Sequence, residues 1–200
     1  MPQFDLRGMK VATYVNTSGT ISYSNKQTIG DAMSCNLEMR FAEGRLYAES
    51  TLAEYMRKAT GGTISVAVKY IPSAAQKVLF GSTDKSRSIS YVPTGTTVTA
   101  TANVTGLILG AKSLGSYVGF ACYAPDMVDG ALKYTCIKVA KCLFGPPAMS
   151  LQTAGENIQF NTPTTSGEFL ADDSTGQAML EVAVCDDENE AKAWVDAVLT

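Results

Sequence analysis

Histidine is entirely absent from the 200-residue chain. Histidine is the side chain that most often serves as general acid or base near neutral pH, and it is the commonest protein ligand of metal ions. Its absence removes the usual hydrolase triads and most zinc sites. We therefore expect a protein that is not an enzyme and that uses neither a metal nor a cofactor.

Long apolar runs and paired cysteines are missing too. No stretch approaches the roughly 18 apolar residues of a membrane span, and the start, Met1–Asp5, lacks the basic and apolar regions of a secretory signal. The five cysteines show no C-x-x-C spacing; they are Cys35, Cys122, Cys136, Cys142 and Cys185. We expect them to be buried as small hydrophobic residues in a protein made in a reducing cytoplasm, with no membrane partner.

Basic charge is scarce, because 16 Lys and Arg stand against 19 Asp and Glu, giving a net charge of -3 and a pI of about 5.0. Domains that grip nucleic acid carry a basic face that neutralises phosphates, whereas the longest basic run here is Arg57-Lys58. The composition argues against such a domain. Charged residues make up 18% of the chain, a low share that suits a surface packed against copies of itself.

Alternation of apolar and polar residues dominates what is present. It is clear in Leu37–Phe41, Thr63–Ile71 and Thr97–Val104, and it predicts half-buried strands of an antiparallel sheet. The apolar face of the second segment consists of Ile64, Val66, Val68 and Tyr70. That of the third consists of Val98, Ala100, Ala102 and Val104. Further strands are predicted over Ser88–Val92, Tyr117–Tyr123, Ala131–Ala140, Asn157–Phe160, Glu168–Ala171 and Gln177–Cys185.

Two helices are predicted. Pro72–Phe80 begins with a proline in its first turn and is followed by Gly81 as a stop. The second begins at Asp187, which forms a D-x-x-E capping box with Glu190. Its apolar stripe is Ala191, Trp194, Val195, Val198 and Leu199. Turn residues recur evenly along the chain, so we expect one mainly β domain over residues 1–200, an antiparallel β-sandwich or partly closed barrel flanked by a C-terminal α-helix.

Three segments invite a chemical interpretation. Gly106–Ser113 resembles a phosphate loop, but Ala111 stands where the motif needs a glycine before Lys112, and the glycine spacing is one residue short. Asp172-Asp173 precedes a turn composition that favours Asp for local reasons, and Asp186–Glu188 is explained by helix capping. Neither acidic group has the spacing of a calcium loop.

Several short motifs resemble those of the major tail tube proteins of long-tailed, non-contractile phages. In the first half these are Arg45–Glu49, read as an L-Y-A-[DE] strand, then the glycine turn Gly61-Gly62, a strand, and the helix end Gln76–Gly81. Leu79-Phe80-Gly81 stands where the family has L-L-G, a mild departure.

The second half resembles the family more specifically. Tyr117–Phe120 is similar to a strand of the family that pairs with a second strand, here Lys133–Lys141. Ala154–Phe169 follows the family's hairpin pattern, with its I-x-F-x-T-P core, nearly position by position. The resemblance covers about residues 45–199, and the first 44 residues match weakly.

The resemblance implies a structural subunit that self-assembles into hexameric rings, which stack into a tube inside the virion tail. Its expected partners are copies of itself, a tape-measure protein, and tail terminator and tip proteins, and genome DNA passes through the lumen without specific binding. Assembly would take place in the bacterial host cytoplasm. Two alternatives stay open: the tube of a phage-derived tail-like particle, and, from a different class, a β-sandwich module that binds glycans or cell walls.

Within the tube interpretation, two sets of residues are candidates for assembly. The inter-subunit sheet is assigned to the Leu46–Glu49 strand and the Gly155–Phe169 hairpin, with the named residues Leu46, Tyr47, Ala48, Glu49, Glu156, Ile158, Phe160 and Phe169. Ring stacking is assigned to predicted loops at Thr83–Arg87 and Gly106–Gly115, with the named residues Asp84, Lys85, Arg87, Leu109 and Lys112.

Overall fold

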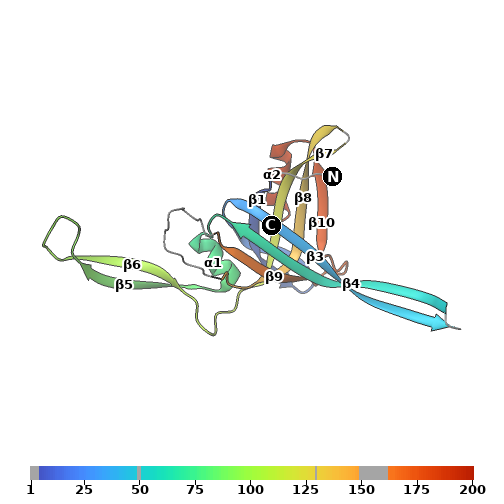
Figure 1. Ribbon diagram of the computed structural model, residues 1–200, viewed down its shortest axis with the longest axis horizontal. Coiled ribbons are helices and arrows are strands. Elements are labelled where there is room, and N and C mark those ends of the chain that lie inside the picture. Colours follow the sequence, from blue (N-terminus) through green and yellow to red (C-terminus); the bar gives the residue numbers. More distant parts are fainter. Residues whose placement is uncertain (1–4, 49–50, 129, 149–161) are drawn as a thin grey trace, which may run out of the picture.

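The computed structural model describes residues 5–48, 51–128, 130–148 and 162–200. In chain order the elements are β1 (Arg7–Thr17), β2 (Thr20–Thr28), β3 (Ala32–Ala48), β4 (Thr51–Val68), α1 (Ser73–Phe80), β5 (Thr83–Tyr91), β6 (Ala100–Ile108), β7 (Val118–Val128), β8 (Ala131–Phe144), β9 (Thr164–Leu170), β10 (Leu180–Cys185) and α2 (Glu188–Ala197). The predicted antiparallel β fold with a C-terminal helix is confirmed (Figure 1).

The main sheet has the strand order β2-β1-β7-β8-β9-β4-β3, and every neighbouring pair is antiparallel. It branches at β8. One edge of β8 is paired with β7, while the other is shared between β10, which pairs with Tyr134–Val139, and β9, which pairs with Lys141–Phe144. Over the described residues the sheet does not close into a barrel, which agrees with the sandwich form of the prediction.

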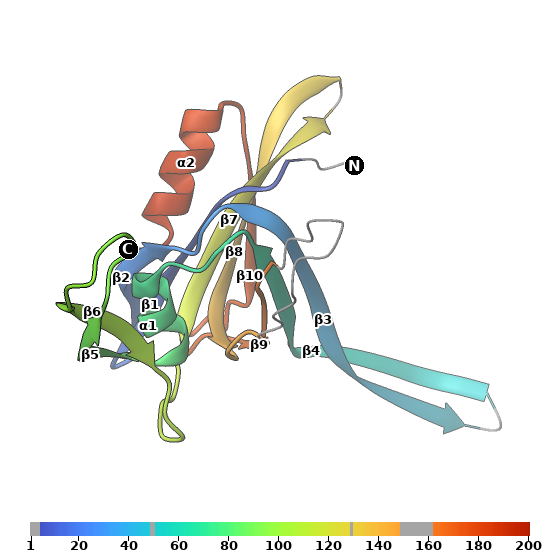
Figure 2. The ribbon, with the colours of Figure 1, turned by 60° about the vertical axis from the view of Figure 1, so that its left-hand side comes forward.

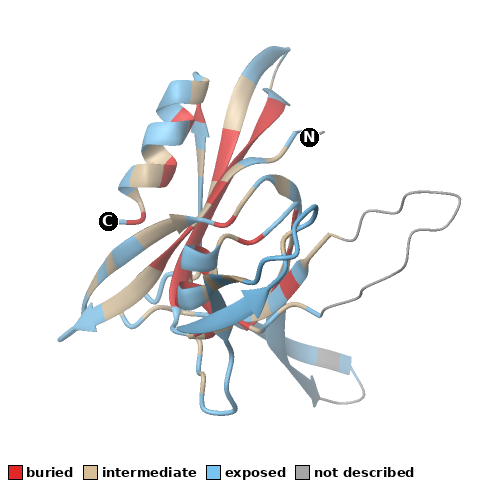
Figure 3. Cartoon of the chain, turned by 90° about the vertical axis from the view of Figure 1, so that its left-hand side faces the viewer, coloured by how far each residue is buried: buried red, intermediate tan, exposed pale blue. Residues whose placement is uncertain are grey.

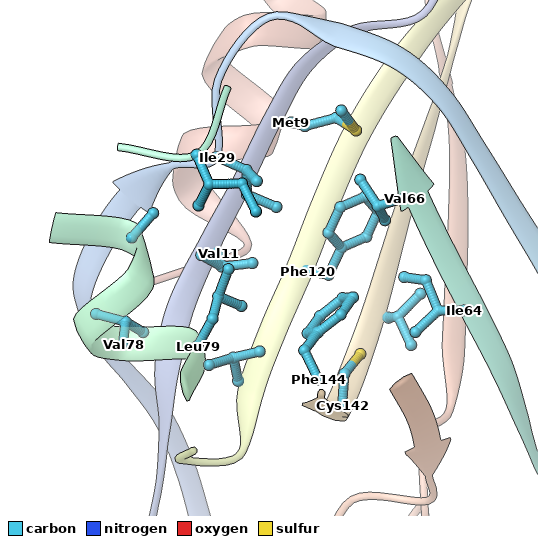
Figure 4. Packing of buried hydrophobic residues seen from close by; sticks show 14 of the residues in the cluster. Met9, Val11, Ile29, Ile64, Val66, Val78, Leu79, Phe120, Cys142 and Phe144 are labelled. Carbon is cyan, nitrogen blue, oxygen red and sulfur yellow. The ribbon is translucent and has the colours of Figure 1, made fainter. Parts of the chain in front are cut away.

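The main core lies between the two halves of this curved sheet and is closed at one end by α1 (Figure 4). The predicted alternation in β4 is confirmed, because Ile64, Val66 and Val68 are completely buried there. Tyr70 lies beyond the end of the strand and is exposed, so the buried apolar face is one residue shorter than predicted. The helix prediction for α1 is also confirmed, and Gly81 ends it in the left-handed conformation with φ +66°.

A second core lies on the opposite face of β1, β7, β8 and β10, where α2 packs across the strands (Figure 2). The predicted N-cap is present: Asp187 Oδ1 accepts a hydrogen bond from Asn189 N at 2.7 Å. Glu190 reaches back as expected, although it accepts from Asp186 N at 2.9 Å rather than from the cap residue itself. Of the predicted apolar stripe, Ala191, Val195 and Leu199 are fully buried.

The glycine pair Gly61-Gly62 is not a turn, and the prediction is wrong here. Both residues lie inside the continuous strand β4, at a register shift opposite Arg40 and Phe41. Gly61 has φ +131°, and a Cβ there would lie 2.6 Å from Phe169 O. The glycines therefore allow a β-bulge and a close approach of β9, and the strand continues through them.

Two ribbons project from the body toward opposite ends of the long axis (Figure 1). The β3–β4 ribbon, formed by residues 41–48 and 51–59, arises because β9 pairs with β4 only over Gly62–Ala67. The β5–β6 ribbon consists of β5 and β6 alone, a separate two-stranded sheet. Figure 3 shows that both ribbons are almost wholly exposed. The predicted half-buried strand over Thr97–Val104 is correct only in part, because β6 begins at Ala100 and, of the predicted apolar face, Ala100 and Ala102 are half-buried whereas Val98 and Val104 are exposed.

Candidate assembly interface

The β5–β6 ribbon has two chemically different faces, set by the strict alternation of both strands. Cross-strand partners share a face, and the register pairs Arg87 with Val104 and Ile89 with Ala102. The apolar-basic face consists of Lys85, Arg87, Ile89, Tyr91, Ala100, Ala102 and Val104. The hydroxyl face consists of Ser86, Ser88, Ser90, Thr101, Asn103 and Thr105. A ribbon with one apolar face and no covering layer is an open contact surface.

The predicted stacking loop at Thr83–Arg87 is a strand, so the loop assignment is wrong. Asp84 ties the base of the ribbon to α1 through an ion pair with Lys77 Nζ at 2.7 Å. Lys85 and Arg87 lie in β5 and have no ion pair with any residue in the described part of the chain. Their charge is therefore available to a partner of opposite charge.

The second predicted loop, Gly106–Gly115, is strand up to Ile108 and then a tight turn. Gly110 N donates to Ser113 Oγ, and Ser113 N donates back to Gly110 O, both at 2.9 Å. The following segment packs against the end of α1, where a Cβ on Gly115 would lie 2.1 Å from Leu79 O. The turn thus exposes Leu109 and Lys112 to solvent beside a segment that packs against the end of α1.

The β3–β4 ribbon carries the other candidate residues. Arg57 lies over the ring of Phe41 at 3.6 Å, and Glu43 lies 3.7 Å from Arg45 and 3.6 Å from Arg57. A hydrogen bond to Glu43 raises the pKa of Tyr55. This mixture of arginine and aromatic side chains is typical of protein interfaces.

The structure places the predicted inter-subunit residues in three different situations. Leu46 and Tyr47 lie near the ribbon tip with 58% and 61% of their surface exposed, and Ala48 ends β3 beside them. Phe169 is 1% exposed in the main core, so its side chain is not offered to a neighbour. The remaining residues, together with the predicted strand Asn157–Phe160, lie outside the described residues; they are Glu49, Glu156, Ile158 and Phe160.

An open groove of about 520 Å³, which the sequence did not reveal, crosses the outer face of β3, β4 and β9. Its centre is a cross-strand row in which Glu38, Thr63 and Glu168 are neighbours, and Glu168 accepts a hydrogen bond from Arg40 Nη1 at 2.9 Å. The rest of the lining comes from Asn36, Ile64, Ser65, Ser166 and Gly167, with no aromatic ring among the lining residues. Ligand sites for small molecules are lined mainly by apolar and aromatic side chains, so this groove is a polar sheet face rather than such a site.

Asp173 is the centre of a polar cluster outside the ribbons. It accepts hydrogen bonds from Lys141 Nζ at 2.8 Å, Tyr14 OH at 2.9 Å and Asn16 Nδ2 at 3.2 Å. The hydrogen bond from Lys141 is the main cause that lowers the pKa of Asp173, and the same bond raises the pKa of Lys141. The neighbouring Asp172 accepts from Ala178 N and Ser174 N. Asp173 therefore fixes the 171–179 loop to the body, while Asp172 closes the loop on itself, in agreement with the turn interpretation.

The cysteines form buried thiols, as predicted. Four of them are buried and Cys35 is half-buried. Cys136 Sγ lies 3.7 Å from Cys185 Sγ in the second core, and burial raises the pKa of Cys136 to about 12. A thiol with so high a pKa is protonated at neutral pH and chemically inert.

Among the residues with a described position, no group of three or more His, Cys, Asp or Glu is placed to hold a metal ion. In the same part of the chain, neither helix has the length and apolar character needed to cross a membrane. Comparison with protein-family models found no matching family, and comparison with curated proteins found no match. The two ribbons and the open sheet edges are thus the features of this chain that invite a functional explanation.

Proposed function

We propose that the protein is the repeating subunit of a phage tail tube, a structural protein that works by assembling with copies of itself. The observation that carries the proposal is the pair of ribbons that leave the body in opposite directions with no core of their own (Figure 1). Their geometry supports self-assembly, and the motif resemblance supports the tail tube as the kind of assembly.

An isolated two-stranded ribbon is only marginally stable in water, because two strands cannot bury a hydrophobic face. In the β5–β6 ribbon, Ile89, Tyr91 and Val104 are 45–49% exposed on one face. Each free strand edge also leaves unpaired backbone donors and acceptors that favour pairing with another chain. A neighbouring subunit that covers this face and pairs with this edge would relieve both costs.

Ribbons at opposite ends of one molecule favour head-to-tail contacts, in which one surface of each copy meets a different surface of the next. Such contacts close into rings or continue into filaments, depending on the rotation between copies. A stacked-ring tube uses both outcomes, since contacts within a ring close and contacts between rings continue. The hexameric ring itself is taken from the resemblance.

The charge of the chain suits a conduit for DNA. With a net charge of -3 per subunit, six copies carry about -18 per ring, and like charge keeps a phosphate backbone from adhering to the wall. The polar face of β3, β4 and β9, with Glu38 and Glu168 on it, is a surface to which DNA would bind weakly.

Electron microscopy of the concentrated full-length protein tests the proposal. We expect tubes of regular bore, and we expect Ile89→Thr combined with Val104→Thr to abolish them, because threonine keeps strand propensity while removing apolar surface. The matched control, Ser88→Thr with Asn103→Thr on the hydroxyl face, should still form tubes. A protein that stays monomeric at every concentration, or that binds glycans without assembling, would contradict the proposal.

A further inference from the structure

One sheet edge in the body is both open and apolar. Strand β10 pairs with β8 along one side only, so in the described part of the chain its other edge has no strand beside it. On the face away from α2, it exposes Leu180, Val182 and Val184, the last two at 56%. Three aliphatic side chains in a row on an unpaired edge form a template for another strand.

The next side chain on this face after Val184 is acidic. Asp186 continues the β10 row and is ion-paired with Lys133, which also lies opposite Asp126 in the β7–β8 ladder. Asp126 is 3% exposed and accepts a hydrogen bond from Thr135, and its Oδ1 atom has no hydrogen-bond partner among the residues that the structure describes. Within the described ranges Lys133 forms its ion pair with Asp186 and none with Asp126. The two acids therefore outnumber the one lysine at this end of the β10 row.

The free edge of the β5–β6 ribbon has the complementary order. Along β5, the apolar-basic face presents Lys85, Arg87, Ile89 and Tyr91 in sequence, two cations followed by two apolar side chains. Read in the opposite direction, β10 presents Asp186, Val184, Val182 and Leu180. When the strands run antiparallel, Lys85 meets Asp186, and Ile89 and Tyr91 meet Val182 and Leu180, while Arg87 lies opposite Val184. In the parallel direction Lys85 would instead face Leu180, and Tyr91 would face Asp186.

We propose that β5 of one copy adds as an antiparallel strand to the free edge of β10 in the next copy. The register pairs Lys85 with Asp186, Ile89 with Val182, and Tyr91 with Leu180. The added ribbon extends the β7-β8-β10 sheet by two strands. Strand β5 thereby gains backbone hydrogen bonds along its free edge, and its apolar side chains gain aliphatic cross-strand neighbours on β10. The inference rests on the proposed self-assembly and specifies the strands that join.

The other open edges fit the ribbon less well. Strand β2 has no row of three exposed aliphatic side chains, and its Lys26 would add like charge. Strand β3 offers an apolar row that ends on an acid, Glu43, but this acid already lies between Arg45 and Arg57. Placing Lys85 there would bring three cations around one carboxylate, which is unfavourable.

Cysteine cross-linking between two singly substituted proteins tests the register. Ser88→Cys in one protein and Ala183→Cys in the other place thiols at directly opposed positions, as do Ile89→Cys and Val182→Cys. Successive pairs in an antiparallel ladder alternate between two spacings, so one of these two mixtures has the shorter separation. We expect a mixed disulfide dimer after mild oxidation with oxidised glutathione, which accepts two electrons and two protons as the two thiols join.

Three controls show whether a cross-linked dimer reports the proposed register of β5 on β10. The unsubstituted protein reports on the native thiols, which are buried or half-buried. Ser88→Cys mixed with Glu181→Cys tests a register shifted by two residues, and Ser88→Cys mixed with Arg40→Cys tests the edge of β3. Cross-linking to either of these in preference to Ala183→Cys would overturn the inference. Electron micrographs of the same samples separate the two proposals, because tubes without the β5–β10 cross-link overturn this inference and leave the proposed function standing.

Charge reversal provides an independent measurement. Lys85→Glu places an acid against Asp186, and we expect it to raise the protein concentration needed for assembly by about tenfold or more. Lys85→Arg should assemble like the unsubstituted protein. An unchanged assembly threshold for Lys85→Glu would show that Lys85 does not face an acidic partner.

Discussion

Strand β4 in the body and the β5–β6 ribbon share the same period-two alternation, yet the alternation has different consequences in the two places. In β4, Ile64, Val66 and Val68 are completely buried beneath the opposing half of the sheet. In the ribbon, Ile89 and Val104 stand 45% and 49% exposed. Alternation therefore predicts that a strand has an apolar face, while the rest of the fold decides whether this same chain covers it. Where the chain does not, we propose that a second copy covers it.

The largest expected contrast between body and ribbon concerns aromatic side chains. Phe120→Ala removes a fully buried ring from the main core and should lower the free energy of unfolding by about 3–5 kcal/mol. Tyr91→Ala on the ribbon should change it by less than about 0.5 kcal/mol. Urea unfolding of dilute monomer measures both values. Equal losses for the two variants would mean that the ribbon is packed within the monomer.

A smaller contrast concerns glycines in strands. Gly61→Ala introduces a side chain at φ +131°, against the backbone of Phe169, and should cost about 1–3 kcal/mol. Gly106→Ala in β6 meets no atom within 4 Å and should change stability by about 0.5 kcal/mol or less, in either direction. Thermal unfolding of the two variants compares them directly. A neutral Gly61→Ala would show that the bulge in β4 does not need glycine.

The smallest expected effect is electrostatic. The pKa of Asp173 is lowered from its ordinary value of 3.8, chiefly by its hydrogen bond with Lys141. The ionised Asp173 side chain therefore stabilises the folded state, and this stabilisation is fully present above pH 3.8. This contribution is lost as the pH falls from about 3.8 through the lower pKa of the folded state. The Asp173→Asn variant should therefore be less stable than the unsubstituted protein at neutral pH, and its free energy of unfolding should fall less on acidification. The free energy of unfolding, measured for both proteins between pH 2 and pH 6, tests this. An equal change with pH in the two proteins would contradict the prediction.

Parts of the fold could be predicted because their signals are local. The cap at Asp187, the stop at Gly81 and the buried row in β4 each depend on residues close together in the sequence. Strands β1 and β2 were not predicted. In β1, Val11 packs in the main core and Ala12 in the second core on the opposite face, so adjacent residues are both buried and no apolar–polar alternation marks the strand.

The candidate assembly surface was harder to predict, for a related reason. Thr83–Arg87 has the polar composition of a loop, and only pairing with β6 makes it a strand. The cluster around Asp173 joins residues as far apart as Tyr14, which no local pattern connects. The open edge of β10 depends on how β8 is shared between β9 and β10, a property of topology that composition does not carry.

Hydrogen exchange measured by mass spectrometry, in dilute monomer and in assembled protein, tests most directly whether neighbours complete the ribbons. We expect amides of residues 83–91 and 100–108 to exchange rapidly in the monomer and to become protected on assembly, while β7 is protected in both states. Ribbon amides that are already protected in the monomer, or that stay unprotected in the assembled protein, would contradict the proposal that a second copy covers them.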